Sequence, residues 1–143
     1  MNVSDITIVF VLGSWHLPIF FDEVRNRLTT LGYNSVAVPH PSMGALAGTK
    51  DLTDDIATLH ATIEECSSEG KRVVLVVHSY GGLVASGAAE GMGLKERKAK
   101  GKNGGIIMIL YFAAFIIPKG STMVDALGGK LLPWCRLEVR IRN

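Results

Sequence analysis

The feature that most constrains the fold is a set of three runs made almost entirely of apolar residues. They are "ITIVFVL" at 6–12, "VVLVV" at 73–77 and "IIMILYFAA" at 106–114. Short apolar runs rich in valine and isoleucine are typical of strands covered on both faces of a parallel sheet. A shorter segment, "SVAVP" at 35–39, predicts a fourth strand.

Helical patterns separate these strands. One helix is predicted between Pro18 and Gly32, a second between Asp51 and Gly70, and a short third helix at 81–90. In the first two, apolar residues recur every three or four positions, at Phe20, Val24, Leu28 and Leu31, and at Leu52, Ile56, Leu59, Ile63 and Cys66. The alternation predicts an α/β fold, a parallel sheet with helices on both faces and the strand order 35–39, 6–12, 73–77, 106–113.

Composition limits the class of protein. The chain has 143 residues, 48% of them hydrophobic and 20% charged, which is typical of one domain with its own core. The apolar stretch at 106–118 is shorter than the roughly 20 residues that span a bilayer, so we expect no membrane segment.

Charge and cysteine usage exclude further classes. The formal net charge is only +2, and the basic cluster has no interleaved aromatic residues, so we interpret it as a solvated face rather than a nucleic-acid surface. Its members are Lys95, Arg97, Lys98, Lys100 and Lys102. Cys66 and Cys135 lack CxxC or metal-ligand spacing, and no basic signal-peptide region begins the chain. We therefore expect free thiols, no metal, no cofactor and a cytoplasmic location.

Ser79 stands where the strand at 73–77 gives way to a helix, in "VVLVVHSYGG". Ligands of parallel α/β sheets gather at the carboxyl ends of the strands. An abrupt strand-to-helix turn holds a serine hydroxyl above the sheet when its flanking residues are small, and Gly81 is such a residue. Val77 departs from the pattern G-x-S-x-G, which has glycine two positions before the serine.

This segment, with "VFVLGSWHLPIFFDEVRNRLTTLGY" after the first strand, resembles the α/β-hydrolase superfamily. The resemblance extends from about residue 6 to Trp134 and is greatest to small fungal hydrolases related to plant methylesterases and hydroxynitrile lyases. Leu12 replaces a histidine common in that family, while Gly13 and Ser14 remain.

The resemblance implies roles for three residues. Ser79 corresponds to the catalytic nucleophile, and the backbone N–H groups of Tyr80 and Ser14 correspond to the two donors of the oxyanion hole. An alternative role for the Ser14 hydroxyl is to cap the helix that begins near Pro18.

The partners of such a nucleophile are missing from the sequence. In this family an acid and then a histidine follow the serine, but all four histidines, His16, His40, His60 and His78, lie at or before position 78. We expect His78 to pack beneath the turn, His16 to face substrate or cap a helix, and His60 to be a partly buried structural residue. Asp125 follows the last strand, and it has no histidine to orient.

We therefore interpret residues 1–134 as the N-terminal part of an α/β-hydrolase domain that lacks the C-terminal strands, and 135–143 as a divergent tail. One hypothesis is a serine hydrolase for a small ester or acyl substrate, truncated before the acid and histidine, with the isolated chain inactive. The alternative is an inactive remnant or small-molecule binding module. Nucleotide binding is disfavoured because no G-x-x-x-x-G-K-[ST] occurs. We also expect self-association through the apolar edge strand 106–113, with Ile107, Ile109 and Tyr111 uncovered.

Overall fold

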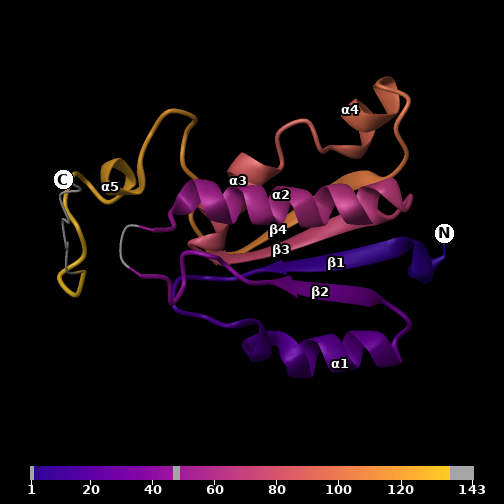
Figure 1. Cartoon of the computed structure of the whole chain (residues 1–143), viewed down its shortest axis with the longest axis horizontal. Coiled ribbons are helices and arrows are strands. Elements are labelled where there is room, and N and C mark those ends of the chain that lie inside the picture. Colours follow the sequence, from indigo (N-terminus) through magenta and orange to yellow (C-terminus); the bar gives the residue numbers. More distant parts are fainter. Residues whose placement is uncertain (1, 47–48, 136–143) are drawn as a thin grey trace.

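A computed structural model describes residues 2–46 and 49–135 of the chain. Four parallel strands form one sheet in the order β2-β1-β3-β4, as Figure 1 shows. Their bounds are Ile6–Val11 (β1), Asn34–Val38 (β2), Arg72–Ser79 (β3) and Gly105–Ala114 (β4). The predicted fold class and strand order are therefore confirmed.

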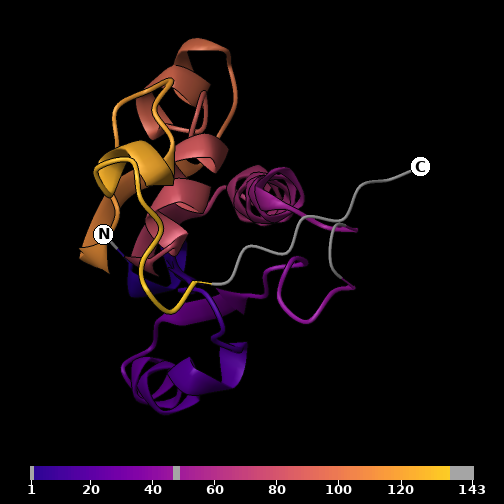
Figure 2. The ribbon, with the colours of Figure 1, turned by 90° about the vertical axis from the view of Figure 1, so that its left-hand side faces the viewer.

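Helices cover both sides of the sheet. Figure 2 shows α1 on one side and α2 and α3 on the other. The helical elements are the 3-10 turns Val3–Asp5 (η1) and Pro18–Phe21 (η2) and the helices Asp22–Thr30 (α1), Leu52–Ser68 (α2), Gly81–Ala88 (α3), Leu94–Ala99 (α4) and Met123–Ala126 (α5). None of the helices in the described ranges is both long and apolar enough to cross a bilayer.

The core lies between the sheet and the pair α2 and α3. Leu59 and Ile63 of α2 and Val84 of α3 are fully buried against the valines and leucine of β1 and β3. The N-terminus of α2 is fixed by a capping box between Asp51 and Asp54, which satisfies backbone N–H groups that the helix leaves unpaired. The predicted amphipathic face of this helix is therefore the one that packs on the sheet.

The face of α1 is less well covered. Phe20 is 64% exposed and Leu31 is 66% exposed, although both belong to the apolar pattern of the first predicted helix. This helix contacts β2 at the edge of the sheet, and within the described ranges no second helix flanks it on that side. The pattern predicted a helix in this segment, but the α-helix begins only at Asp22, because Pro18–Phe21 form the 3-10 turn η2. Phe20 therefore lies before α1 and Leu31 directly after it.

The basic cluster is only partly a solvated face. Its four lysines are exposed, but Arg97 is buried and donates hydrogen bonds to the carbonyls of Asn103 and Gly104 and to the carboxylate of Glu64. Pairing with a carboxylate and two carbonyls compensates for removing the guanidinium from water. The prediction of a solvated position is wrong for Arg97, which instead secures the turn that leads into β4. Cys66 and Cys135 are free thiols.

The outer face of β4 is bare. Met108, Leu110 and Phe112 are 50% to 64% exposed, whereas Ile109 is partly buried and packs against the core. The expectation that Ile109 is uncovered is therefore wrong, because strand residues alternate between faces and Ile109 points to the helix-covered one. The self-association expected from this strand stays a prediction.

We expect the unmodified chain to form oligomers in solution through the exposed outer face of β4 and through its outer edge, with which no other strand of the described residues pairs. Replacing Leu110 with lysine places a charge on that face and should shift the population toward monomer. Sedimentation velocity over a range of concentrations measures the effect, and Leu46→Lys, at an exposed leucine of the loop after β2, is the matched control. A monodisperse monomer of the unmodified chain would contradict the prediction.

Candidate functional site

Ser79 is the last residue of β3, and α3 begins two residues later at Gly81. Its φ of 52° lies in the left-handed region, which a residue with a side chain adopts at a cost of about 1–2 kcal/mol. Such strain at a strand-to-helix turn is typical of a nucleophile elbow, where it lifts the side chain above the sheet. The structure places Ser79 at the turn that the sequence predicted.

Two glycines allow this turn to pack closely. A Cβ on Gly81 would lie 2.6 Å from the carbonyl oxygens of Val11 and Leu12, and a Cβ on Gly82 would lie 2.1 Å from that of Phe115. The first turn of α3 therefore lies directly on the end of β1 and on the segment after β4. Val77, where the pattern has a glycine, has its side chain fully buried in the core.

The loop after β1 passes beside the turn. A Cβ on Gly13 would lie 3.1 Å from the Cβ of Ser79, so this glycine brings the backbone of Ser14 next to the serine. Within the described part of the chain, neither the N–H of Ser14 nor that of Tyr80 donates to another protein atom. The structure therefore brings together Ser79 and the two segments that carry the predicted backbone donors.

Ser14 does not cap a helix. The N-cap position of η2 is Leu17, and no side chain caps that turn. The carbonyl of Ser14 instead accepts a hydrogen bond from Nδ1 of His16 at 2.8 Å. The alternative role of the Ser14 hydroxyl as a helix cap is therefore wrong, because three residues separate Ser14 from the start of η2 at Pro18.

His16 and His78 lie beside the turn. Their ring centroids are 5.3 Å apart, and the ring of His78 also lies 5.8 Å from that of Phe112.

His60 is exposed on α2, so the expectation that it is partly buried is wrong: position 60 falls just outside the stripe that packs on the sheet. Asp125 forms the capping box of α5 with Thr122, which lowers the pKa of its carboxyl group.

The fourth histidine has a role that the sequence did not reveal. His40 is only 3% exposed, and its Nε2–H donates to the carbonyl of Leu12 at 2.8 Å. Its ring also lies edge-on to that of Tyr80, at 5.4 Å between centroids. The one signal in the sequence is its place two residues after the end of β2, at the sheet edge where ligands gather.

A buried carboxylate was also missed. Asp55 of α2 is fully buried and accepts hydrogen bonds from the N–H and hydroxyl of Ser42 and from the hydroxyl of Tyr80. Burial, followed by the bond to Asp55, raises the pKa of the Tyr80 phenol far above its ordinary value. At the sequence level Asp55 resembles any acidic residue in the first turn of a helix.

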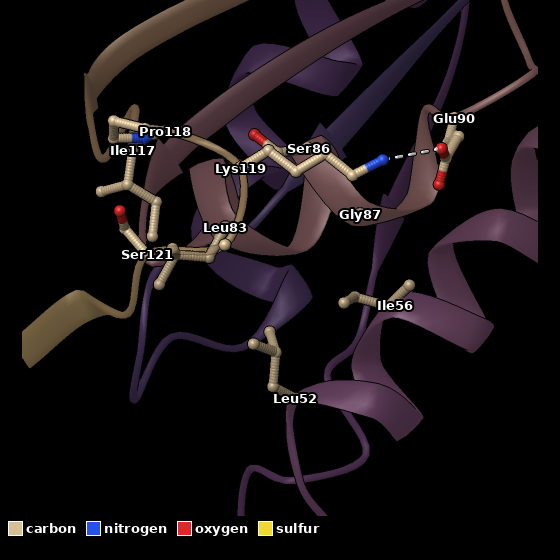
Figure 3. A pocket seen from close by; sticks show the side chains of 11 residues that line it. Leu52, Ile56, Leu83, Ser86, Gly87, Glu90, Ile117, Pro118, Lys119 and Ser121 are labelled. Atoms are coloured by element: carbon tan, nitrogen blue, oxygen red, sulfur yellow. Dashed lines mark hydrogen bonds and ion pairs between the residues drawn. The ribbon is translucent and has the colours of Figure 1, made fainter.

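One cavity in the described ranges lies away from Ser79. Figure 3 shows this cavity of about 530 Å³ between α2, α3 and the segment after β4. Leu52, Ile56 and Leu83 line it, and Lys119 pairs with Glu90 at its rim over 3.3 Å. The ion pair of Lys119 and Glu90 is exposed and contributes little stability. Ser79 is not among the residues that line the cavity. The cavity is therefore separate from the candidate site.

The pH dependence of stability should report on His78. Burial, and secondarily the neighbouring His16, lower the pKa of His78 below its ordinary value of 6.5. Between that value and the lowered pKa, the unfolded chain binds more protons than the folded chain, so stability falls as the pH drops through this window. We expect His78→Gln to reduce the loss of stability between pH 7.5 and pH 5, measured by urea unfolding.

The matched control for this measurement is His60→Gln, because His60 is exposed on α2. That variant should keep the pH dependence of the unmodified chain. If His78→Gln and His60→Gln change stability by the same amount at both pH values, the assignment to His78 is wrong.

Comparisons with known proteins agree with this architecture. The model of the alpha/beta hydrolase family matches residues 8–140. An alpha/beta hydrolase of Aspergillus novofumigatus, nvfD, is 32% identical over 132 residues, which are 92% of this chain and 50% of the relative. A probable hydrolase of a Phoma species, R7, is 30% identical over 86% of the chain and 48% of the relative.

A bacterial relative is similar over the same extent. The carbendazim hydrolyzing esterase of a Nocardioides species is 28% identical over 87% of the chain and 48% of the relative. The chain thus spans about half the length of the curated relatives it matches. With a family match over most of its residues and the parallel sheet described above, the chain belongs to the α/β-hydrolase family.

Proposed function

We propose that this protein is part of a serine hydrolase that acts on a small ester or related acyl substrate. Ser79 is the nucleophile, and the backbone N–H groups of Ser14 and Tyr80 form the oxyanion hole. The observation that carries the proposal is the left-handed backbone of Ser79 at the end of β3, with the Gly13 loop directly beside it. The names of the relatives, which include hydrolases and an esterase, support the same class of reaction.

The proposed reaction is acyl transfer. The Ser79 oxygen bonds to the substrate carbonyl carbon while a base takes the serine proton, and the carbonyl electrons move onto oxygen, where the two N–H groups stabilise the charge. The tetrahedral intermediate then expels the alcohol, which takes the proton back from the base. Water hydrolyses the acyl-serine by the same steps in the second half of the reaction.

None of the 143 residues is a histidine that follows Ser79, so the chain has no base at the position where this family carries it. His40 is buried and donates to the Leu12 carbonyl, and His60 lies exposed on α2; neither forms a hydrogen bond with Ser79 in the described structure. We propose that a histidine and its acidic partner come from a part of the protein outside this chain, since the relatives are about twice as long. The second candidate, an inactive remnant or a binding module, is favoured by the same lack of a histidine after Ser79.

Reaction with a fluorophosphonate probe distinguishes the two functions. A reactive Ser79 displaces fluoride from phosphorus and becomes covalently labelled, which intact-mass measurement detects. The label should disappear in Ser79→Ala and persist in Ser86→Ala, a control serine of α3 whose hydroxyl donates to the Gly82 carbonyl. Because the proposed base lies outside the chain, we expect this labelling to be slow and to need prolonged exposure to excess probe. If Ser79 is labelled no faster than Ser86 under these conditions, the binding module is the better description.

A further inference from the structure

We propose that Asp55 and His40 are positioning residues that hold the two oxyanion donors, in the Ser14 loop and at Tyr80, at a fixed separation. The inference rests on the proposed function of Ser79 and extends it to two buried polar residues from other parts of the chain. Neither residue touches Ser79, so both act through the segments that carry the donors.

Asp55 fixes the Tyr80 side of the pair. Its Oδ2 accepts a hydrogen bond from the Tyr80 hydroxyl at 2.8 Å and one from the Ser42 hydroxyl at 2.6 Å, while Oδ1 accepts from the Ser42 N–H at 2.9 Å. The carboxylate is fully buried, so these donors are what compensates for its removal from water. If Tyr80 moved, the buried carboxylate of Asp55 would lose one of its hydrogen-bond donors. The bond therefore restrains the position of Tyr80, including its backbone N–H.

His40 fixes the Ser14 side. Its Nε2–H donates to the carbonyl of Leu12, a buried residue two positions before Ser14. The other ring nitrogen, Nδ1, has no partner in the described part of the chain, so this bond is the contact that orients the ring. The same Leu12 carbonyl lies against Gly81, the first residue of α3. The start of the Ser14 loop is therefore held from two sides.

The two anchors meet at Tyr80. The ring of His40 packs edge-on against the Tyr80 ring, so the phenol that Asp55 holds also supports the histidine that holds Leu12. This chain of contacts links α2, the segment after β2, the loop after β1 and the turn after β3. Fixed donors stabilise a developing oxyanion without having to reorganise during the reaction. That is what a rigid link between the Ser14 loop and Tyr80 provides.

The test uses phenylboronic acid, whose boron accepts the Ser79 oxygen while the serine proton goes to solvent. The resulting anionic tetrahedral adduct is detected by boron NMR, and benzamide serves as a planar ligand of similar shape. Tyr80→Phe keeps the backbone N–H and removes only the hydroxyl held by Asp55. Losing one oxyanion donor outright lowers kcat about 10²–10³-fold. A Tyr80 N–H that is only displaced has a smaller effect, so we expect Tyr80→Phe to weaken boronate binding about tenfold and to leave benzamide binding unchanged.

Two comparisons separate positioning from a general loss of stability. Tyr33→Phe, which removes a phenol hydroxyl outside this network, should change neither affinity. His40→Gln retains an N–H that can reach the Leu12 carbonyl and should keep most of the boronate affinity, whereas His40→Leu should lose it. Equal effects of His40→Gln and His40→Leu, or an unchanged ratio of boronate to benzamide affinity in Tyr80→Phe, would overturn the proposal.

A second measurement does not depend on the reactivity of Ser79. Proton–nitrogen NMR spectra of the unmodified chain and Tyr80→Phe should show shifts of the Ser14 amide as well as the Tyr80 amide, because the two are linked through His40. A Ser14 amide that stays in place overturns the link. If the unmodified chain forms no tetrahedral boronate, the proposed function of Ser79 is wrong, and the amide spectra still decide the positioning.

Discussion

Ester hydrolysis by the 143-residue chain should be on the order of 10⁶-fold slower than by a serine hydrolase with a complete triad, because removing the triad histidine has a cost of that size in kcat. In the described structure the histidines beside Ser79 are His16, which donates to the Ser14 carbonyl, and His78, whose ring lies against that of His16. In the described part of the chain, neither ring forms a hydrogen bond with a carboxylate. The rate of p-nitrophenyl acetate hydrolysis, compared with that of Ser79→Ala, measures the effect.

Turnover at about 1 s⁻¹ or more, an ordinary rate for an enzyme, would contradict this prediction if Ser79→Ala abolished it. Such a result would mean that one of the two nearby histidines takes the serine proton. His16→Gln and His78→Gln, measured separately, would then identify the base. His60→Gln is the control, since His60 lies exposed on α2.

The sheet could be predicted because its information is local. Each strand is a short apolar run. Ser79, Gly81 and Gly82 lie close together in the sequence, so the segment 78–82 is enough to predict the turn between β3 and α3. The two glycines can also be seen next to Ser79 in the sequence. The atoms that make them necessary, in Leu12 and Phe115, are distant in sequence. Strand order followed from the alternation of strands and helices.

The polar network could not be predicted because its contacts are long-range. Asp55 and Tyr80 are 25 residues apart, and His40 and Leu12 are 28 apart. An aspartate in the first turn of a helix is ordinarily exposed and interacts with the helix dipole. Only the packing of α2 against the segment after β2 shows that Asp55 is buried instead.

The bare face of β4 shows a different limit of sequence patterns. An all-apolar run predicts that both faces of a strand are covered, yet Met108, Leu110 and Phe112 are exposed in this chain. The exposed Phe20 and Leu31 near α1 show the same property. Patterning records which residues are suited to burial, and it does not record which element covers them.

Replacing Gly82 with alanine should destabilise the fold by about 3 kcal/mol or more, the upper part of the range for overpacked positions. The new Cβ would lie 2.1 Å from the carbonyl oxygen of Phe115 and 3.0 Å from its backbone carbon and nitrogen. All three are main-chain atoms, which cannot move aside by changing a rotamer. The same segment is tied to the turn, because the N–H of Phe115 donates to the Ser79 carbonyl at 3.1 Å.

The substitution must therefore push α3 away from the segment after β4 and lengthen the hydrogen bond to Ser79, so it should weaken fluorophosphonate labelling as well as stability. Urea unfolding of the variant gives the change in free energy. Gly93→Ala is the matched control, because its Cβ would meet only the flexible end of Glu96, 3.2 Å away, at an ordinary φ of −60°. If the two alanine variants unfold at the same urea concentration, the close approach of Phe115 to Gly82 is not a constraint on this fold.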